Sequence, residues 1–327
     1  MPSALGRKNL LSLAAHLPLQ MAFMPLTLGG AAAMGYRQMT MSRQLGVSRT
    51  AVEVLNARCA MHLFGQREDR LSLQLAHALP NASPLGLGAA LFPLWLKHRI
   101  DGSEPLYPRV PPTGQERVVD LIPARTQVLD QMIERLLPAT AQFVVLGAGL
   151  DVRAAAVAAE AGIPCYELDQ PQLQSLKKEA LASFDAIPGN LHFIAIDFQR
   201  HALGQRLAQC GVDPNKRTLF LWEGVTLYLT EDAVVETLRE IAGFAAPGSV
   251  LLADIYADRF LRLGRIGPGK LFLSLSGESF RFGLPLHDPA RELAAFFQPS
   301  GLSLREAVHL GGDTSRGCFA AVVEAQL

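Results

Sequence analysis

The chain has 327 residues, of which 49% are hydrophobic and 18% are charged. This is enough apolar material for a sizeable core, so the composition excludes a disordered protein. The 30 basic and 30 acidic residues give a formal net charge of zero. Because nucleic acids attract proteins with a basic excess, we expect no nucleic-acid partner.

Four cysteines are scattered along the chain, at Cys59, Cys165, Cys210 and Cys318. They form no CxxC pair, have no zinc-ligand spacing and are too sparse for a secreted disulfide framework. We therefore expect reduced thiols in a cytoplasmic protein without a metal site. Cys165 and Cys318 lie in apolar runs and are expected to be buried.

A long uncharged stretch, residues 9–35, follows Arg7 and Lys8 and resembles a secretory signal or a membrane span. Pro18 and Pro25 interrupt it, which disfavours a stable span. A packed or lid-forming helical arm is the first interpretation. An arm that binds a membrane surface or a partner is the second, and a true signal or span is the last.

Residues 36–100 alternate helical patterns with short breaks, and residues 50–53 have the spacing of a capping box. Four prolines in residues 104–113 predict a linker. We therefore expect an N-terminal helical arm or cap region at 1–113 and a second domain at 114–327.

After Asp120 the helical and strand patterns alternate, which predicts βαβ units and a parallel sheet covered on both faces. Strands are expected at 143–146, 165–168, 191–196, 219–222 and 249–253, and helices at 120–136, 152–161, 173–182, 202–210, 232–244 and 289–297. Runs at 302–308 and 318–324, joined by a glycine turn, predict an antiparallel hairpin. The fold class is therefore a doubly wound α/β sheet of seven strands, unlike the six parallel strands of a nicotinamide-binding domain.

A glycine turn, residues 146–151, follows the first strand and opens a helix. Gly147, Ala148 and Gly149 permit a tight turn that a ligand can approach closely. In a dinucleotide-binding fingerprint, a third glycine lies beside the pyrophosphate of the ligand. Val152 occupies the position of that glycine here. The pattern therefore favours a ligand without phosphates, such as S-adenosylmethionine, with an ordinary glycine turn as the alternative.

Acidic residues end the next two strands. Glu167, Leu168 and Asp169 end the second strand, and Asp169 lies roughly 20 residues beyond the glycine turn, where a carboxylate can accept ribose hydroxyls. A helix cap is the alternative role for Asp169. Asp197 and Phe198 end the third strand, where a carboxylate and a ring suit adenine, although aspartate is also common in turns.

These motifs together resemble the leucine carboxyl methyltransferase family, which includes protein phosphatase carboxyl methyltransferases and many bacterial small-molecule O-methyltransferases. The matching stretches are ARTQVLD at 124–130, FVVLGAGLDVRA at 143–154, CYELDQP at 165–171, FIAIDF at 193–198, WEGVTLYLTEDAV at 222–234 and GESFRFGLP at 277–285. The likeness covers residues 117–327 and, more faintly, 50–69, while the first 100 residues match poorly. Val152 stands where the family often has threonine.

The resemblance implies a Rossmann-like methyltransferase fold, S-adenosyl-L-methionine as cofactor, and a set of cofactor-binding residues. These are Arg125, Gly147, Ala148, Gly149, Glu167, Leu168, Asp169, Asp197, Phe198 and Glu223. Arg125 would hold the methionine carboxylate, which a guanidinium fork suits well. Glu223 would lie near the amino-acid end of the cofactor. Tyr228, Phe272 and Phe280 are the residues expected at the substrate.

The implied reaction transfers a methyl group to an oxygen. A carboxylate acceptor needs no general base, whereas a hydroxyl acceptor does. His201, His287, His309 and Tyr256 are conceivable bases, but none has persuasive spacing. We therefore assign no catalytic residue and favour a carboxylate.

Three phenylalanines, Phe272, Phe280 and Phe282, follow the fifth strand. With the apolar residues 10–34 they suit either a hydrophobic acceptor pocket and lid or a satellite core. The first reading predicts a lipophilic small-molecule acid or hydroxyl compound as acceptor. The alternatives are methylation of a protein C-terminus, a nicotinamide-dependent oxidoreductase, and a binding protein without catalysis; an RNA substrate is disfavoured by the neutral charge. The oligomeric state stays open.

Overall fold

The computed structural model describes residues 18–198, 200–263 and 279–327. Contacts divide the chain into two compact units, Met1–Val110 and Pro111–Leu327, which are described separately below. Within the described ranges, no helix combines the length and the apolar character needed to cross a membrane. Phe272 and the first part of the apolar arm lie outside the described residues.

The first unit is helical. Its elements are α2 (Met24–Tyr36), the π-helix η1 (Arg37–Met41), α3 (Ser42–Leu45), α4 (Arg49–Leu63), α5 (Arg70–Ala78) and α6 (Pro84–Asp101). The helix start predicted at Thr50 is wrong by two residues, because Ser48 is the N-cap of α4 and its Oγ accepts the Ala51 N–H at 3.2 Å. The hydroxyl of Thr50 lies 2.8 Å from that of Ser48 and so joins this cap instead of forming its own.

Helices α2 and α6 pack closely because glycines face each other at their crossing. A Cβ built on Gly30 would lie 2.5 Å from the Gly86 carbonyl oxygen, and one built on Gly86 would lie 2.9 Å from the Gly30 carbonyl oxygen. The rings of Phe23 and Phe92 also meet edge to face, 4.9 Å apart. This part of the apolar arm is therefore a helix that packs on α6 along one face, while Met24, Leu26 and Leu28 on it are exposed.

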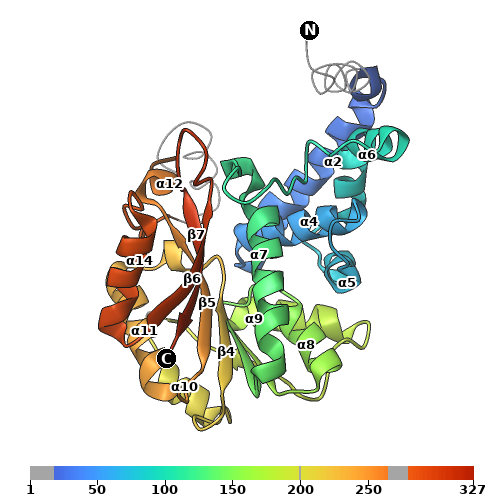
Figure 1. Ribbon diagram of the computed structural model, residues 1–327. Coiled ribbons are helices and arrows are strands. Elements are labelled where there is room, and N and C mark those ends of the chain that lie inside the picture. The colour runs from blue at the N-terminus through green and yellow to red at the C-terminus, as the bar shows by residue number, and fades with distance from the viewer. Residues whose placement is uncertain (1–17, 199, 264–278) are drawn as a thin grey trace. The chain divides into compact units, whose positions relative to one another are not determined.

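The second unit is a doubly wound α/β domain (Figure 1). Its strands are β1 (Gln142–Leu146), β2 (Cys165–Asp169), β3 (Leu191–Ala195), β4 (Thr218–Trp222), β5 (Val250–Tyr256), β6 (Ser303–Leu310) and β7 (Ala320–Gln326). They form one sheet in the order β3-β2-β1-β4-β5-β7-β6, parallel from β3 to β5, with β7 antiparallel to both β5 and β6. The predicted seven-stranded fold is confirmed.

Helices cover both faces of this sheet (Figure 1). On one side lie α7 (Leu121–Leu136), α8 (Arg153–Ala161) and α9 (Pro171–Ala182); on the other lie α10 (Leu203–Gln209), α11 (Glu231–Phe244) and α14 (Pro289–Phe297). Shorter elements are η2 (Val118–Asp120), η3 (Leu137–Ala139), η4 (Thr226–Tyr228), α12 (Asp258–Leu263) and η5 (Gln298–Ser300). Every residue of β1, β4 and β5 is buried, as expected for strands covered on both faces.

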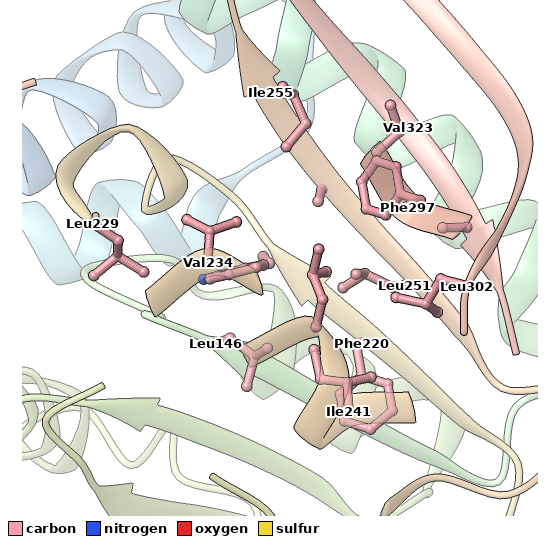
Figure 2. Close-up of a cluster of buried hydrophobic side chains, with 14 of the residues drawn as sticks. Leu146, Phe220, Leu229, Val234, Ile241, Leu251, Ile255, Phe297, Leu302 and Val323 are labelled. Carbon is pink, nitrogen blue, oxygen red and sulfur yellow. The ribbon is translucent and has the colours of Figure 1, made fainter. Parts of the chain in front are cut away.

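The main core lies between the sheet and the second group of helices (Figure 2). Phe220 and Leu251 from the sheet pack with Val234 and Ile241 of α11, and all four side chains are fully buried. The four cysteines are free thiols, and the expected burial of Cys165 and Cys318 is confirmed.

Strand β5 extends three residues beyond the predicted end at Ala253. The additional residues include Asp254 and Tyr256, whose polar groups are buried in the sheet. A carboxylate usually ends an apolar run, because burial without a partner is costly. The strand continues here because both groups have partners, described below.

Replacing Val323 by Ala should lower the free energy of unfolding by about 2 kcal/mol, because two buried methyl groups are lost and a cavity remains. Val323 is fully buried in β7, whereas Val119 in the same unit is 65% exposed. Denaturant unfolding should therefore show almost no effect of Val119→Ala. Equal losses in the two variants would contradict the assignment of this core.

Candidate functional site

The carboxyl ends of the parallel strands meet at one edge of the sheet. The register pairs Leu146 with Leu168, Asp169 with Ala195, and Trp222 with Ala253. The residues that follow these strands therefore lie along the same edge, where open α/β sheets bind ligands. All the described cofactor residues predicted from the sequence, except Arg125 on α7, come from these strand ends and the loops after them.

The glycine turn after β1 adopts left-handed backbone conformations, with φ of +67° at Gly147 and +53° at Gly149. A Cβ on Gly147 would clash with the side chain of Val225, so only glycine fits there. The Ala148 N–H donates to the Leu168 carbonyl oxygen at 3.0 Å, which joins the turn to β2. The turn is thus held between two strand ends, with Gly147 and Gly149 half-buried at the sheet edge.

Asp169 is fixed by two backbone hydrogen bonds. The Gly149 N–H donates to its Oδ2 and the Gln170 N–H donates to its Oδ1, each at 2.6 Å. Burial raises the pKa of Asp169, while the two backbone donors act to lower it. Asp169 is not a helix cap, because the N-cap of α9 is Gln170 and that helix has no side-chain cap hydrogen bond. Each carboxylate oxygen of Asp169 keeps a further lone pair for another donor.

Arg125 occupies the centre of the edge, fully buried beneath the ends of β4 and β5. Its Nη1 donates to Asp254 Oδ2 at 2.7 Å and to the Tyr256 hydroxyl at 2.5 Å, and its Nε lies 2.9 Å from Glu223 Oε1. Burial acts to lower the pKa of Arg125, but the surrounding acidic groups outweigh it and raise the pKa above its usual value. Gly224, with φ of +70°, leaves room for this guanidinium, which lies 3.4 Å from the position of a built Cβ.

A second buried arginine shares Glu223 with Arg125. Arg153 Nη1 pairs with Glu223 Oε2 and lies 2.7 Å from Asp151 Oδ2, while its Nε lies 2.6 Å from Asp130 Oδ1. The strand-edge network, as we call it, therefore contains two guanidinium groups and four carboxylates, those of Asp130, Asp151, Glu223 and Asp254. If all are ionised, the network has an excess of negative charge.

Tyr256 is unsuited to act as a general base. Its hydroxyl donates to Asp254 Oδ2 at 2.6 Å and accepts from Arg125. Burial raises the pKa of Tyr256 well above 10, so the phenol stays protonated at neutral pH. Burial also raises the pKa of Asp254, against the opposing charge of Arg125.

Glu167 and Leu168 differ from what the sequence suggested. Glu167 is 1% exposed and its Oε2 pairs with Lys177 Nζ at 2.5 Å, while Leu168 is fully buried in the core. Lys177 also donates to the Asp151 carbonyl oxygen, so this pair ties α9 to the loop before α8. Neither side chain presents surface to a ligand, and their predicted contact with a cofactor is at odds with this burial.

Asp197 and Phe198 follow β3 beside Asp169. The Ile196 N–H donates to the Asp169 carbonyl oxygen at 2.9 Å, which places Asp197 next in line along the edge. The Asp197 carboxylate lies 3.4 Å from Arg200 Nε, and Phe198 packs against the core. His201, considered above as a base, accepts the Asp197 N–H with its Nδ1.

An aromatic cluster adjoins Arg125. The ring of Tyr228 lies 5.8 Å from that of Phe280, Phe280 lies 5.6 Å from Phe260, and Phe260 lies 5.1 Å from Tyr256. The structure thus brings together two of the three residues predicted at the substrate. Within the described part of the chain, no three or more His, Cys, Asp or Glu side chains are grouped so as to hold a metal ion.

Comparison with known proteins identifies the family. A family model for leucine carboxyl methyltransferase matches residues 88–242. A Mycobacterium marinum protein described as a "putative S-adenosyl-L-methionine-dependent methyltransferase" is 30% identical over 216 residues, which are 65% of this chain and 67% of that protein. The chain belongs to the leucine carboxyl methyltransferase family.

Other relatives match over a smaller share of their length. A Mycobacterium avium protein with the same description is 30% identical over 183 residues, 55% of this chain and 60% of that protein. Among solved structures, magnesium protoporphyrin IX methyltransferase from Synechocystis PCC 6803 with bound SAH is 13% identical, with a TM-score of 0.43, 65% of this chain and 88% of that chain being covered.

Four residues of the strand-edge network, Asp130, Asp151, Arg153 and Asp254, were missed as site residues, and Tyr256 beside them was considered only as a base. Asp254 and Tyr256 fell just beyond the predicted end of β5, and Arg153 was only part of a matching stretch. For Asp254 a signal existed, because one carboxylate inside a strand of seven otherwise uncharged residues implies a buried partner. Nothing local in the sequence singles out Arg153 as a partner of Glu223, 70 residues away.

Lys177→Met should lower the free energy of unfolding by about 3–5 kcal/mol at neutral pH, because it leaves the Glu167 carboxylate buried without a cation. Burial already raises the pKa of Glu167. A carboxyl with a higher pKa in the folded than in the unfolded state costs stability as pH rises through the folded value. The deficit should therefore shrink as pH is lowered.

Lys178→Met is the matched control, since Lys178 is the exposed neighbour of Lys177 on α9. Denaturant unfolding should show little change for this variant at any pH. The double variant Glu167→Gln, Lys177→Met should recover much of the loss. A deficit for Lys177→Met that does not depend on pH would contradict the buried pair.

Proposed function

We propose that this protein is an S-adenosylmethionine-dependent O-methyltransferase whose second unit, near residues 114–327, binds the cofactor at the carboxyl edge of the sheet. The strand-edge network carries the proposal, because it places four carboxylates against two guanidinium groups in a buried site. S-adenosylmethionine has a sulfonium and an ammonium group against one carboxylate, so a cationic ligand would offset the charge excess. When bound, this cofactor supplies an electrophilic methyl group, which leaves its sulfur for an acceptor oxygen.

Arg125 retains one nitrogen for a ligand. Among the described residues, none forms a hydrogen bond or an ion pair with its Nη2, while Nη1 and Nε are engaged. A guanidinium held in this way by Glu223 and Asp254 can offer the remaining N–H groups to the methionine carboxylate. The Glu223 carboxylate pairs with the same guanidinium and suits the ammonium group of the cofactor's methionine portion.

Asp169 and the glycine turn fit the adenosine portion. The Asp169 carboxylate is oriented by Gly149 and Gln170 and can accept ribose hydroxyls with its remaining lone pairs. Asp197 and Phe198 lie after β3, the neighbouring strand, where they would contact the adenine. Val152 is buried at the start of α8, where close approach of a pyrophosphate would require glycine, so a nicotinamide dinucleotide fits less well.

The acceptor is proposed to be the carboxylate of a lipophilic small molecule. Tyr228 and Phe280 offer aromatic surface in a cluster that reaches Arg125 through Phe260 and Tyr256, and such surface suits an apolar body. Tyr256 keeps its proton at neutral pH and so does not act as a general base. An acceptor oxygen that is already ionised is therefore favoured over a hydroxyl. The residues that position the reactants and exclude water would then supply the catalysis.

Asp169→Asn should weaken the binding of S-adenosylhomocysteine by about 1–3 kcal/mol, because an amide oxygen cannot accept all the hydrogen bonds of a carboxylate. Isothermal titration calorimetry measures this loss, and the melting temperature of the variant reports its folding. Asp232→Asn is the control, since Asp232 is exposed on α11. If the wild-type protein binds a nicotinamide dinucleotide and not S-adenosylhomocysteine, the proposal is wrong.

A mass-spectrometric screen of aromatic and aliphatic carboxylic acids with S-adenosylmethionine should detect a methyl ester. For the best substrate, Phe280→Ala should raise KM on the order of tenfold, because apolar contacts with the acceptor are lost, and leave the affinity for S-adenosylhomocysteine unchanged. Phe296→Ala is the matched control, since Phe296 is also half-buried but packs on α14 against Phe282.

A peptide with a C-terminal leucine carboxylate serves as the competing acceptor in this screen. Its methylation, with no reaction of any small acid, would contradict the proposed acceptor class and leave the cofactor assignment intact. An effect of Phe280→Ala on cofactor affinity alone would show that the aromatic cluster does not contact the acceptor.

A further inference from the structure

A cavity lies where β6 ends and its turn to β7 begins, within the second unit. Its volume is about 550 Å³, within the range of sites for small organic molecules. Apolar walls come from Leu286, Ala307 and Val308, and polar groups come from Arg259 and His309. None of these residues belongs to the strand-edge network.

Arg259 is the most informative residue of this cavity. Its Nη2 is buried without a hydrogen-bond partner, and among the described residues no carboxylate forms an ion pair with it. Its guanidinium lies against Gly317, where φ is +71° and a Cβ would be 3.3 Å from Nη1, so the glycine leaves space for it. Arg259 as a whole is half-buried, but a guanidinium nitrogen that is buried without an acceptor is costly, which implies that an anion completes the site.

Two further features point to the same cavity. The Nε2 of His309 is also buried without a hydrogen-bond partner. Leu286 has a φ of +50°, a conformation that leucine rarely adopts and that tends to occur where a site requires it. The cavity thus combines two unsatisfied nitrogen atoms with a constrained apolar wall.

We propose that this cavity binds a small organic acid, separately from the proposed cofactor and acceptor sites. The carboxylate of the acid accepts hydrogen bonds from Arg259 and His309, and its apolar body packs on Leu286, Ala307 and Val308. Asp313 also lines the cavity, and its negative charge disfavours a phosphate dianion relative to a monoanionic carboxylate. Burial raises the pKa of Cys318 to about 11, so the thiol in the wall stays protonated and the site binds its ligand without covalent attack.

The test uses sodium benzoate as the probe and inorganic phosphate as the competing anion, with calorimetry on the full chain. Benzoate should bind the wild-type protein, and Arg259→Gln should weaken this binding on the order of tenfold or more, since a charge-assisted hydrogen bond is lost. Arg316→Gln is the matched control: Arg316 is exposed in the same turn and does not line the cavity. It should bind benzoate as the wild-type protein does.

Two control measurements distinguish a local effect on the cavity from a loss of folding. All variants should bind S-adenosylhomocysteine equally, which shows that they are folded and that the effect is local. Ala307→Leu, which narrows the cavity and leaves Arg259 in place, should also weaken benzoate binding. The proposal is overturned if the wild-type protein does not bind benzoate, if the affinity is unchanged in Arg259→Gln, or if phosphate binds more tightly than benzoate.

Discussion

The carboxylate of Glu223 pairs with two buried arginines, and the carboxyl edge of the sheet depends on this shared contact. Arg125 comes from α7 and Arg153 from the start of α8, so a single side chain after β4 joins elements from both sides of the glycine turn. Buried ion pairs stabilise a protein little when their desolvation is counted, but removing one partner is costly. The network therefore fixes the geometry of the edge more than it adds stability.

The same contact orients the polar groups of the edge. Arg125 is held on Nη1 and Nε, so its planar group cannot rotate, and only Nη2 remains to contact another molecule. Asp169 is oriented in the same manner by two backbone N–H groups. Preorganised donors and acceptors of this kind reduce the entropy lost on binding. With all four carboxylates ionised, their negative charge and the fixed orientation of these groups support the proposed binding of S-adenosylmethionine.

The sequence predicted the fold well because strand patterns, turn glycines and helix caps are local signals. The alternation after Asp120 predicted the five parallel strands, and two runs joined by a glycine turn predicted the antiparallel pair, with strand ends that differ by at most three residues. Ion pairs between distant residues have no such signal, so the partnership of Arg153 with Glu223 was missed. Glu167 shows the opposite error: its position at a strand end suggested exposure, but Lys177, ten residues later, covers it within the fold.

The order of strands in the sheet has a consequence for synthesis of the protein. Strand β5 receives its second neighbour from β7, with Asp254 opposite Val322 and Tyr256 opposite Ala320. On the ribosome, β5 emerges more than sixty residues before that neighbour. Until β7 pairs with β5, Asp254 and Tyr256 lie on an unpaired edge strand, where water can reach Arg125. Pairing of β7 with β5 therefore also completes the burial of Asp254 and Tyr256 in the sheet.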